Sequence, residues 1–216
     1  MSNLIERWAP LGGIIFVVLL IIGLVLIADS PDFDASDQEV TDYLNDDGNL
    51  VRNVIGFYMW GVAAMAFLWF ASGVRTELRR AEGESSALST LGFGAAIVFA
   101  AMLLAAGGAV ASVAGAIEFG DATKPAPDFV RMLPQLGFAM LLVGGAFSAI
   151  IFLLSTSALT LKTGVLPQWI AWLGFVAAIV LLFGALFIPM IALPIWVLAA
   201  SIVLLMRRQE RTTAAA

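Results

Sequence analysis

The chain has 216 residues, of which 61% are hydrophobic and only 12% are charged, and its mean hydropathy is +0.99. A soluble domain carries roughly a quarter charged residues. The composition therefore excludes a water-soluble globule and predicts an integral membrane protein, with the lipid bilayer as its first partner. The net charge of -5 at pH 7 argues against a nucleic-acid partner, because affinity for nucleic acid comes from neutralising phosphates.

Histidine and cysteine are both absent from the sequence. Their absence removes disulfides, thiol nucleophiles and the usual ligands of zinc, haem and iron–sulfur clusters. No phosphate loop of the G-x-x-x-x-G-K-[ST] type occurs either. We therefore expect a protein that binds no cofactor and is not an enzyme.

Six apolar runs reach or approach the length of about 20 residues that a hydrocarbon core requires. They predict an all-α fold with a single domain, residues 1–216, which is an integral membrane bundle of six transmembrane helices. The last apolar stretch is too long for one crossing. Pro189 and Pro194 divide it into two helices that meet in a turn, because proline disfavours helix in the residue before it. The predicted spans are residues 8–28, 50–73, 88–117, 131–161, 168–187 and 189–206.

The basic residues predict the orientation of this bundle. Six spans put eight lysines and arginines on one side of the membrane and three on the other, and the positive-inside rule makes the richer side cytoplasmic. Both termini are then cytoplasmic, in a multi-pass protein of the bacterial cell membrane. A five-span alternative, with residues 168–206 as one crossing plus a re-entrant piece, would move the last three arginines outside and is disfavoured. The cytoplasmic set is Arg7, Arg75, Arg79, Arg80, Lys162, Arg207, Arg208 and Arg211, and the outer set is Arg52, Lys124 and Arg131.

The first run and the tryptophans fit this topology. The first run is predicted to remain as a signal anchor, because its apolar length exceeds the roughly 7 to 15 residues of a cleaved signal peptide. Trp169 and Trp172 fall at the predicted cytoplasmic boundary and Trp196 near the outer boundary, where indole rings are enriched. Trp60 falls in the middle of a span, so its ring requires a packed or a lipid-facing position.

The first outer loop, residues 29–49, contains eight acidic residues and no lysine or arginine. Ser36 and Glu39 fit a capping box, in which each side chain bonds the backbone of the other residue. Val40 and Leu44 follow on one helical face. The loop is therefore predicted to form a short amphipathic helix over the outer ends of the bundle.

The carboxylates in this loop are candidate ligands for a divalent cation, because such cations prefer clustered oxygen ligands. Asp32, Asp34 and Asp37 are weak candidates. The pattern lacks the glycine and the final glutamate of an EF-hand loop, so we predict no metal site and favour a solvated acidic face. We expect Arg52 and Arg131 to hold the outer loops by ion pairs, ahead of binding an anion or a substrate. The partner of Arg131 is either Glu118 or the acidic first loop.

Small residues predict where the membrane helices approach closely, because helix association in lipid depends on backbone proximity. Stripes at four-residue spacing occur in the third and fourth spans, and we expect these two helices to pack against each other. A homo-oligomer interface, or a contact with another membrane protein, is the alternative. The stripe residues are Gly107, Ala111 and Gly115 in the third span and Gly137 and Gly145 in the fourth.

Four polar residues of the fourth span are candidates for lining a polar cavity: Gln135, Ser148, Ser155 and Thr156. Serine and threonine in membrane helices usually bond back to carbonyls of their own helix, which favours a structural role. No acid or base lies centrally in any predicted span, and that counts against a proton-coupled pump. Our leading hypothesis is a non-enzymatic accessory, scaffold or envelope interaction protein. The alternative is a small-solute permease or channel with an uncharged path.

The connector between the fourth and fifth spans carries the motif G-V-L-P-Q-W at residues 164–169. With the residues around it, this segment resembles the connector of a family of uncharacterised bacterial polytopic membrane proteins of the domain-of-unknown-function type. The resemblance implies six spans and an acidic first outer loop, and it carries over no functional residue. Physically, Gly164 ends one helix, Pro167 begins the next, and Trp169 anchors it at the interface.

Overall fold

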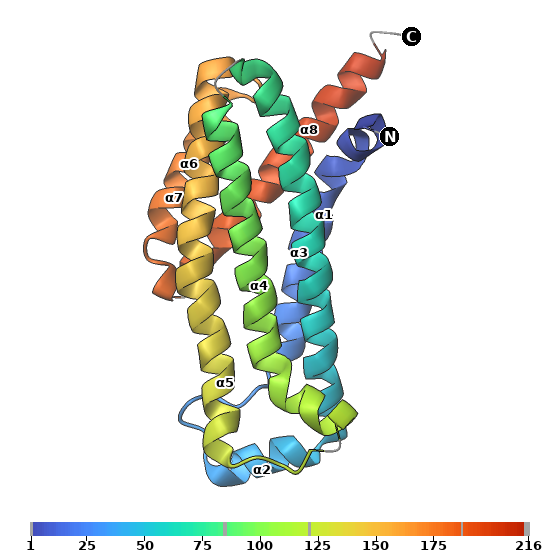
Figure 1. Cartoon of the computed structure of the whole chain (residues 1–216), viewed down its shortest axis with the longest axis vertical. Coiled ribbons are helices and arrows are strands. Elements are labelled where there is room, and N and C mark those ends of the chain that lie inside the picture. Colours follow the sequence, from blue (N-terminus) through green and yellow to red (C-terminus); the bar gives the residue numbers. More distant parts are fainter. Residues whose placement is uncertain (1, 84–85, 121, 187, 214–216) are drawn as a thin grey trace.

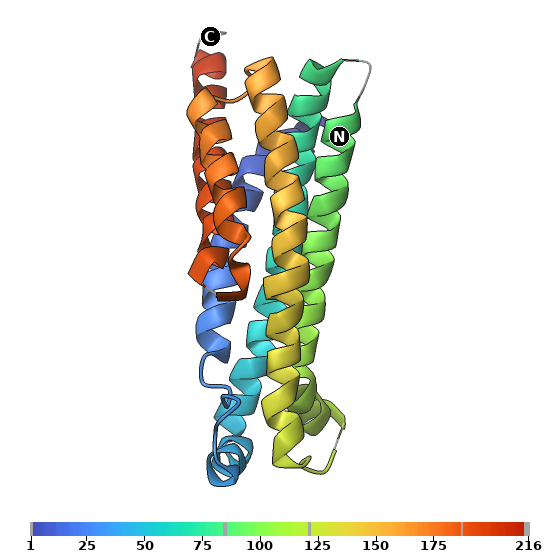
Figure 2. The same cartoon turned by 90° about the vertical axis from the view of Figure 1, so that its left-hand side faces the viewer.

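A computed structural model describes residues 2–83, 86–120, 122–186 and 188–213, with the side chains of residues 2–7, 185 and 208–213 left undescribed. The described chain is an elongated bundle of helices (Figure 1). Long helices lie side by side along the bundle, while α2 lies across one end (Figures 1 and 2). The elements are α1 Ser2–Ile27, α2 Asp37–Asn45, α3 Asp47–Glu82, α4 Ala87–Gly120, α5 Pro127–Ala139, the π-helical η1 Met140–Gly145, α6 Ala146–Thr163, α7 Gln168–Leu181, the 3-10 turns η2 Gly184–Leu186 and η3 Ile188–Ile191, and α8 Ala192–Thr213.

Five helices are long and apolar enough to cross a membrane, which indicates a helical membrane protein. The predicted all-α class is confirmed at this level for the described residues. Helices α3 and α4 are both longer than the spans predicted for them, with 36 and 34 residues. At about 1.5 Å per residue they are about 50 Å long, whereas the hydrocarbon core is only about 30 Å thick. These two helices are therefore long enough to extend well beyond the core.

The expected fifth span is shorter than predicted. Helix α7 has 14 residues and ends at Leu181, and the chain then turns through η2 and η3 before α8 begins at Ala192. A helix of 14 residues is about 21 Å long, less than the hydrocarbon core. The six-span count therefore remains a prediction.

The turn between α7 and α8 lies halfway along the bundle (Figures 1 and 2). A Cβ atom added at Gly184 would lie 3.1 Å from the backbone oxygen of Leu142 and 3.0 Å from the Cβ of Ala146. Both residues belong to the middle of the uncharged stretch between Arg131 and Lys162. Helices α7 and α8 thus form a hairpin whose tip packs against the middle of the long α5–η1–α6 helix.

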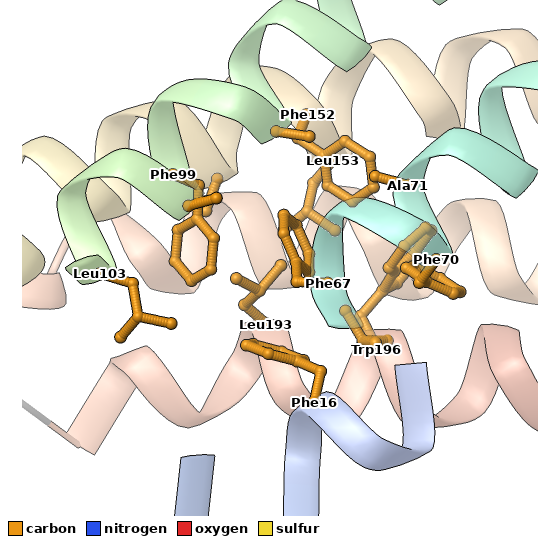
Figure 3. Packing of buried hydrophobic residues seen from close by; sticks show 14 of the residues in the cluster. Phe16, Phe67, Phe70, Ala71, Phe99, Leu103, Phe152, Leu153, Leu193 and Trp196 are labelled. Atoms are coloured by element: carbon orange, nitrogen blue, oxygen red, sulfur yellow. The ribbon is translucent and has the colours of Figure 1, made fainter. Parts of the chain in front are cut away.

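Aromatic side chains fill the centre of the bundle (Figure 3). The ring of Phe67 lies 5.0 Å from Phe16 on α1 and 4.8 Å from Phe99 on α4, measured between centroids. The ring of Phe152 on α6 packs edge-on against Trp196 on α8 at 5.7 Å. Tilted and edge-on pairs are the favourable arrangements for aromatic rings. Side chains from all the long helices therefore interlock at one level of the bundle.

Two tryptophans take part in this packing. The expectation that Trp196 lies at the outer boundary is wrong, because its side chain is fully buried and its Nε1 donates to the backbone oxygen of Ile170 at 3.0 Å. Trp60 is also buried, and its Nε1 donates to Leu20 at 3.2 Å. Each indole therefore joins two helices through a carbonyl oxygen.

The fourth predicted span is one continuous helical run with a π-helical segment, η1, in its middle. A π-segment displaces backbone carbonyls from the regular α-helical ladder. Ser148 lies directly after it and donates its hydroxyl to the oxygens of Gly144 and Gly145, both at 2.9 Å. The serine therefore supplies hydrogen bonds to backbone carbonyl oxygens at the point where the π-helix changes to an α-helix.

The two ends of the bundle differ in charge. Both chain termini, the α3–α4 connection and the α6–α7 connection lie at one end (Figure 1). Arg75 and Lys162 lie near the ends of α3 and α6, and Arg207 lies in the last part of α8, all toward this end. Arg52 and Arg131 instead lie near the starts of α3 and α5, toward the end covered by α2. The two sets of basic residues that the sequence separates are thus at opposite ends.

Candidate functional site

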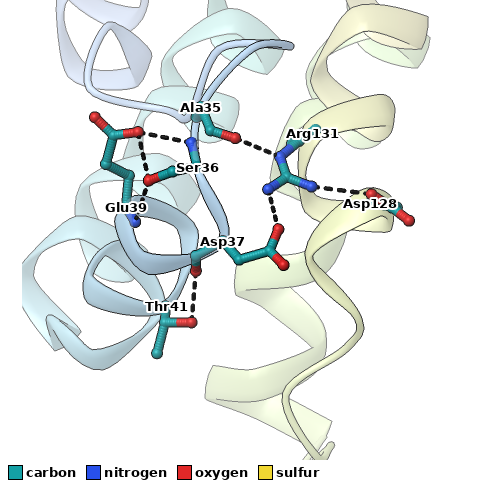
Figure 4. A network of polar contacts seen from close by, with 7 residues as sticks. All are labelled: Ala35, Ser36, Asp37, Glu39, Thr41, Asp128 and Arg131. Carbon is teal, nitrogen blue, oxygen red and sulfur yellow. Dashed lines mark hydrogen bonds and ion pairs between the residues drawn. The ribbon is translucent and has the colours of Figure 1, made fainter.

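The end of the bundle opposite the termini is closed by residues 29–46, which we call the cap. Its helix α2 begins with a complete capping box (Figure 4). The backbone nitrogen of Glu39 donates to Ser36 Oγ at 3.2 Å, and the backbone nitrogen of Ser36 donates to Glu39 Oε2 at 2.7 Å. The Ser36 hydroxyl also donates to Glu39 Oε2 at 2.9 Å. The two hydrogen bonds that the carboxylate accepts, first the one from the Ser36 backbone and then the one from its hydroxyl, lower the pKa of Glu39. The cap helix therefore has its first turn fixed by its own side chains.

Arg131, on α5, holds the cap to the bundle (Figure 4). Its Nε donates to the backbone oxygen of Ala35 at 2.7 Å, its Nη1 pairs with Asp128 at 2.9 Å, and its Nη2 pairs with Asp37. The side chain is only 13% exposed. The predicted pairing of this arginine with the acidic first loop is confirmed.

Two further contacts join the cap to the helix ends. Arg52 Nη1 pairs with Asp29 at 2.9 Å, as the expectation of ion-paired loops requires. Lys124 Nζ donates to Asn45 Oδ1 at 2.6 Å. The basic residues of this end thus connect elements that are far apart in the sequence.

The underside of α2 is apolar and its outer side is acidic. Val40 and Leu44 are buried in a small cluster of their own with residues of α3, α4 and α5: Leu50, Val54, Ala114 and Val130. Acidic residues of the cap remain exposed, and so does the ring of Phe33, which is 68% exposed. The exposed acids include Asp32, Asp34, Asp42 and Asp46. The cap therefore presents a fixed acidic surface that includes an exposed aromatic ring.

The three aspartates considered as cation ligands do not form a ligand set. Asp37 pairs with Arg131, while Asp32 and Asp34 are exposed. Within the described part of the chain, no group of three or more acidic residues could hold a metal ion.

Sequence reasoning missed one polar junction beneath the cap. Asn53 on α3 is buried, and its Nδ2 donates to Ser30 Oγ at 2.9 Å and to Tyr43 Oη at 3.2 Å. Its Oδ1 is buried without a hydrogen-bond partner among the described residues. A cavity of about 10 Å³, bordered by these three residues, lies at this point, and that is about the room that one water needs. An asparagine at the start of an apolar helix was the only signal in the sequence.

The four candidate cavity residues are not brought together. Gln135 is exposed, whereas Ser148, Ser155 and Thr156 are buried. Thr156 donates to the oxygens of Phe152 and Leu153 in its own helix, at 2.6 and 3.1 Å. The cavity bordered by Thr156 measures only about 10 Å³.

The third and fourth predicted spans pack against each other, as expected, but not every stripe residue lies between them. Gly137 does face α4, because an added Cβ would lie 2.6 Å from the backbone oxygen of Ala106. Gly107, however, faces Phe57 of α3 at 2.9 Å, and Gly115 has nothing within 4 Å. Ala111 is buried, and an added Cβ at Gly145 would lie 3.1 Å from Leu141 of the preceding turn. Only part of the predicted stripe therefore joins the third and fourth long helices.

No family model, curated protein or solved structure matches this chain. The resemblance of the connector at residues 164–169 to a bacterial family therefore stays a prediction. The five apolar helices and the buried aromatic centre define the class as a helical membrane protein.

Proposed function

We propose that this protein is a non-enzymatic, multi-pass protein of the cell membrane that acts as a scaffold or accessory protein. In this proposal both termini are cytoplasmic, and the cap lies on the outer side, where it binds a partner with a basic surface. The basic residues near the termini support the orientation through the positive-inside rule. The packed aromatic centre supports an interaction role over a permease.

The observation that carries the proposal is the rigidity of the cap. Arg131 joins Ala35, Asp37 and Asp128, and the apolar underside of α2 is buried on the bundle. An acidic surface that is already fixed in this way loses less conformational entropy when a partner binds. Exposed acids around an aromatic ring give such a surface both long-range attraction and an anchoring side chain.

The test is site-specific photo-cross-linking in native membranes, with a photoreactive amino acid at Phe33. We expect one discrete protein adduct, which weakens in the variant Asp32→Asn/Asp34→Asn/Asp42→Asn. A photoreactive residue at Ile21, which is 54% exposed on α1, is the control and should not give that adduct.

A second measurement separates scaffold from permease. Purified protein in liposomes should leave the permeability to glycerol, urea and small ions at the level of empty liposomes. Solute flux through the reconstituted protein, together with no adduct at Phe33, would contradict the proposal.

A further inference from the structure

The end of the bundle near the termini carries a basic hollow. Arg75, Thr76, Arg79 and Arg80, on the last turns of α3, surround a surface hollow of about 330 Å³. We call this site the basic basin. Its volume is at the lower end of the range of small-molecule sites, and guanidinium groups bind phosphate through paired hydrogen bonds.

Arg75 is held in place at this basin. Its guanidinium carbon lies 4.9 Å from the centroid of the Phe93 ring on α4, a cation–π distance. Its Nε is buried and has no hydrogen-bond partner among the described residues. Because this nitrogen is closed off from the surface, a ligand in the basin would meet other atoms of Arg75.

Polar neighbours of Arg75 and Arg79 make hydrogen bonds within the protein. The hydroxyl of Thr76 donates to the backbone oxygen of Ser72 at 2.9 Å. The carboxylate of Glu82 accepts the amides of Leu88 and Ser89 at 3.0 and 3.2 Å, at the start of α4. An anion in the basin would therefore meet guanidinium groups first.

The face of α3 that carries the basin continues into an apolar surface. Met65 and Trp69 lie on the same helical face as Thr76 and Arg80, at spacings of 4, 7 and 4 residues. Met65 is 62% exposed and Trp69 is 46% exposed. Free phosphate would make no favourable contact with this apolar surface, whereas the acyl chains of a lipid would pack on it.

We propose that the basic basin binds the phosphate headgroup of an anionic phospholipid, with the acyl chains lying along Met65 and Trp69. Arg75 and Arg79 hold the phosphate, and Phe93 positions Arg75. This site lies at the opposite end of the bundle from the cap and does not depend on the proposed function.

The test is native mass spectrometry of the full chain in detergent, titrated with phosphatidylglycerol or with phosphatidylcholine. We expect phosphatidylglycerol to bind more tightly, and the variant Arg75→Gln/Arg79→Gln to weaken its binding by about tenfold with no effect on phosphatidylcholine. The matched control is Lys162→Gln/Arg207→Gln, which removes the same charge from the same end and should keep most of the binding.

Two further variants distinguish a loss of lipid binding from a loss of folding. Arg79→Gln alone should weaken binding with an unchanged Tm, and Arg75→Lys should fall between wild type and Arg75→Gln, because lysine keeps the charge without the planar guanidinium. Equal binding of the two lipids, or equal losses in the control variant, would overturn the proposal. Full displacement of phosphatidylglycerol by millimolar inorganic phosphate would overturn the assignment to a lipid.

Discussion

The guanidinium of Arg131 reaches the backbone oxygen of Ala35, 96 residues earlier in the chain, at 2.7 Å. This contact joins the chain just before α2 to the start of α5. The positively charged guanidinium binds this carbonyl oxygen more strongly than a neutral side chain would. The arginine thus determines where the cap sits on the bundle.

Replacing Arg131 should release the cap without unfolding the bundle. In Arg131→Gln, hydrogen exchange of residues 37–45 should become faster, while exchange in the centre of α3 stays unchanged, because the aromatic packing is distant from the cap. Hydrogen exchange with mass spectrometry measures both regions. Arg79→Gln, at the other end, is the control and should leave the cap protected.

The pH dependence of α2 should follow Glu39. Its pKa is lowered in the folded protein from 4.5, so its contribution to stability is fully present above the unfolded-state value and is lost as the pH falls through the folded-state value. Exchange of α2, corrected for intrinsic rates, should therefore accelerate below about pH 4.5. Glu39→Gln should remove this dependence, since glutamine also serves in a capping box. An identical acid response in both proteins would contradict the assignment.

Gly137 and Gly115 provide a matched pair for helix packing. Gly137→Ala should lower the free energy of unfolding by about 1–3 kcal/mol, because the new methyl group would overlap the Ala106 oxygen. Gly115→Ala, with open space around it, should be neutral or stabilising by about 0.5–1 kcal/mol. Unfolding in mixed detergent micelles measures both. Equal losses in the two variants would show that α4 and α5 do not pack as described.

Trp196 should be far more sensitive to substitution than an exposed tryptophan. Trp196→Phe removes the hydrogen bond to Ile170 and should cost about 1–3 kcal/mol. The control is Trp172→Phe, whose side chain is 60% exposed and which should change stability by less than about 0.5 kcal/mol. The same unfolding assay serves for this pair.

The depth of the α7–α8 turn can be measured with single cysteines, since the chain has none. With a membrane-impermeant maleimide, Asp34→Cys should react in intact cells and Lys162→Cys only after permeabilisation. Ile188→Cys, at a turn residue that is 76% exposed, should stay unlabelled in both, because we expect a turn midway along the bundle to lie in the hydrocarbon. Labelling of Ile188→Cys in intact cells would instead favour a complete fifth crossing.

Local signals in the sequence predicted the local structure well. The helix Asp37–Asn45 follows from Ser36 and Glu39, because a capping box and an apolar face are contained in adjacent residues. The salt bridges of Arg52 and Arg131 follow from charge, since an outer loop rich in acids attracts the bases nearest to it. Both features depend on few residues and short distances.

Features that depend on which helices are neighbours could not be predicted in this way. The end of α7 at Leu181 is hidden, because the residues on both sides of it are apolar and only Gly184 interrupts them. The burial of Trp196 depends on α7 being its neighbour, and a tryptophan near a predicted boundary reads as an interfacial anchor. Gly107 and Gly115 look alike in sequence, yet only the first meets a partner helix.

The short α7–α8 hairpin also bears on how the protein is assembled. Residues 182–191 contain no charged side chain, so the hairpin can enter the bilayer from the side of the termini without carrying a charge across it. Its indole–carbonyl bond, between Trp196 and Ile170, lies within the hairpin itself, whereas its contact at Gly184 needs the α5–η1–α6 helix in place. The hairpin therefore brings one of these contacts with it and takes the other from a helix that precedes it in the chain.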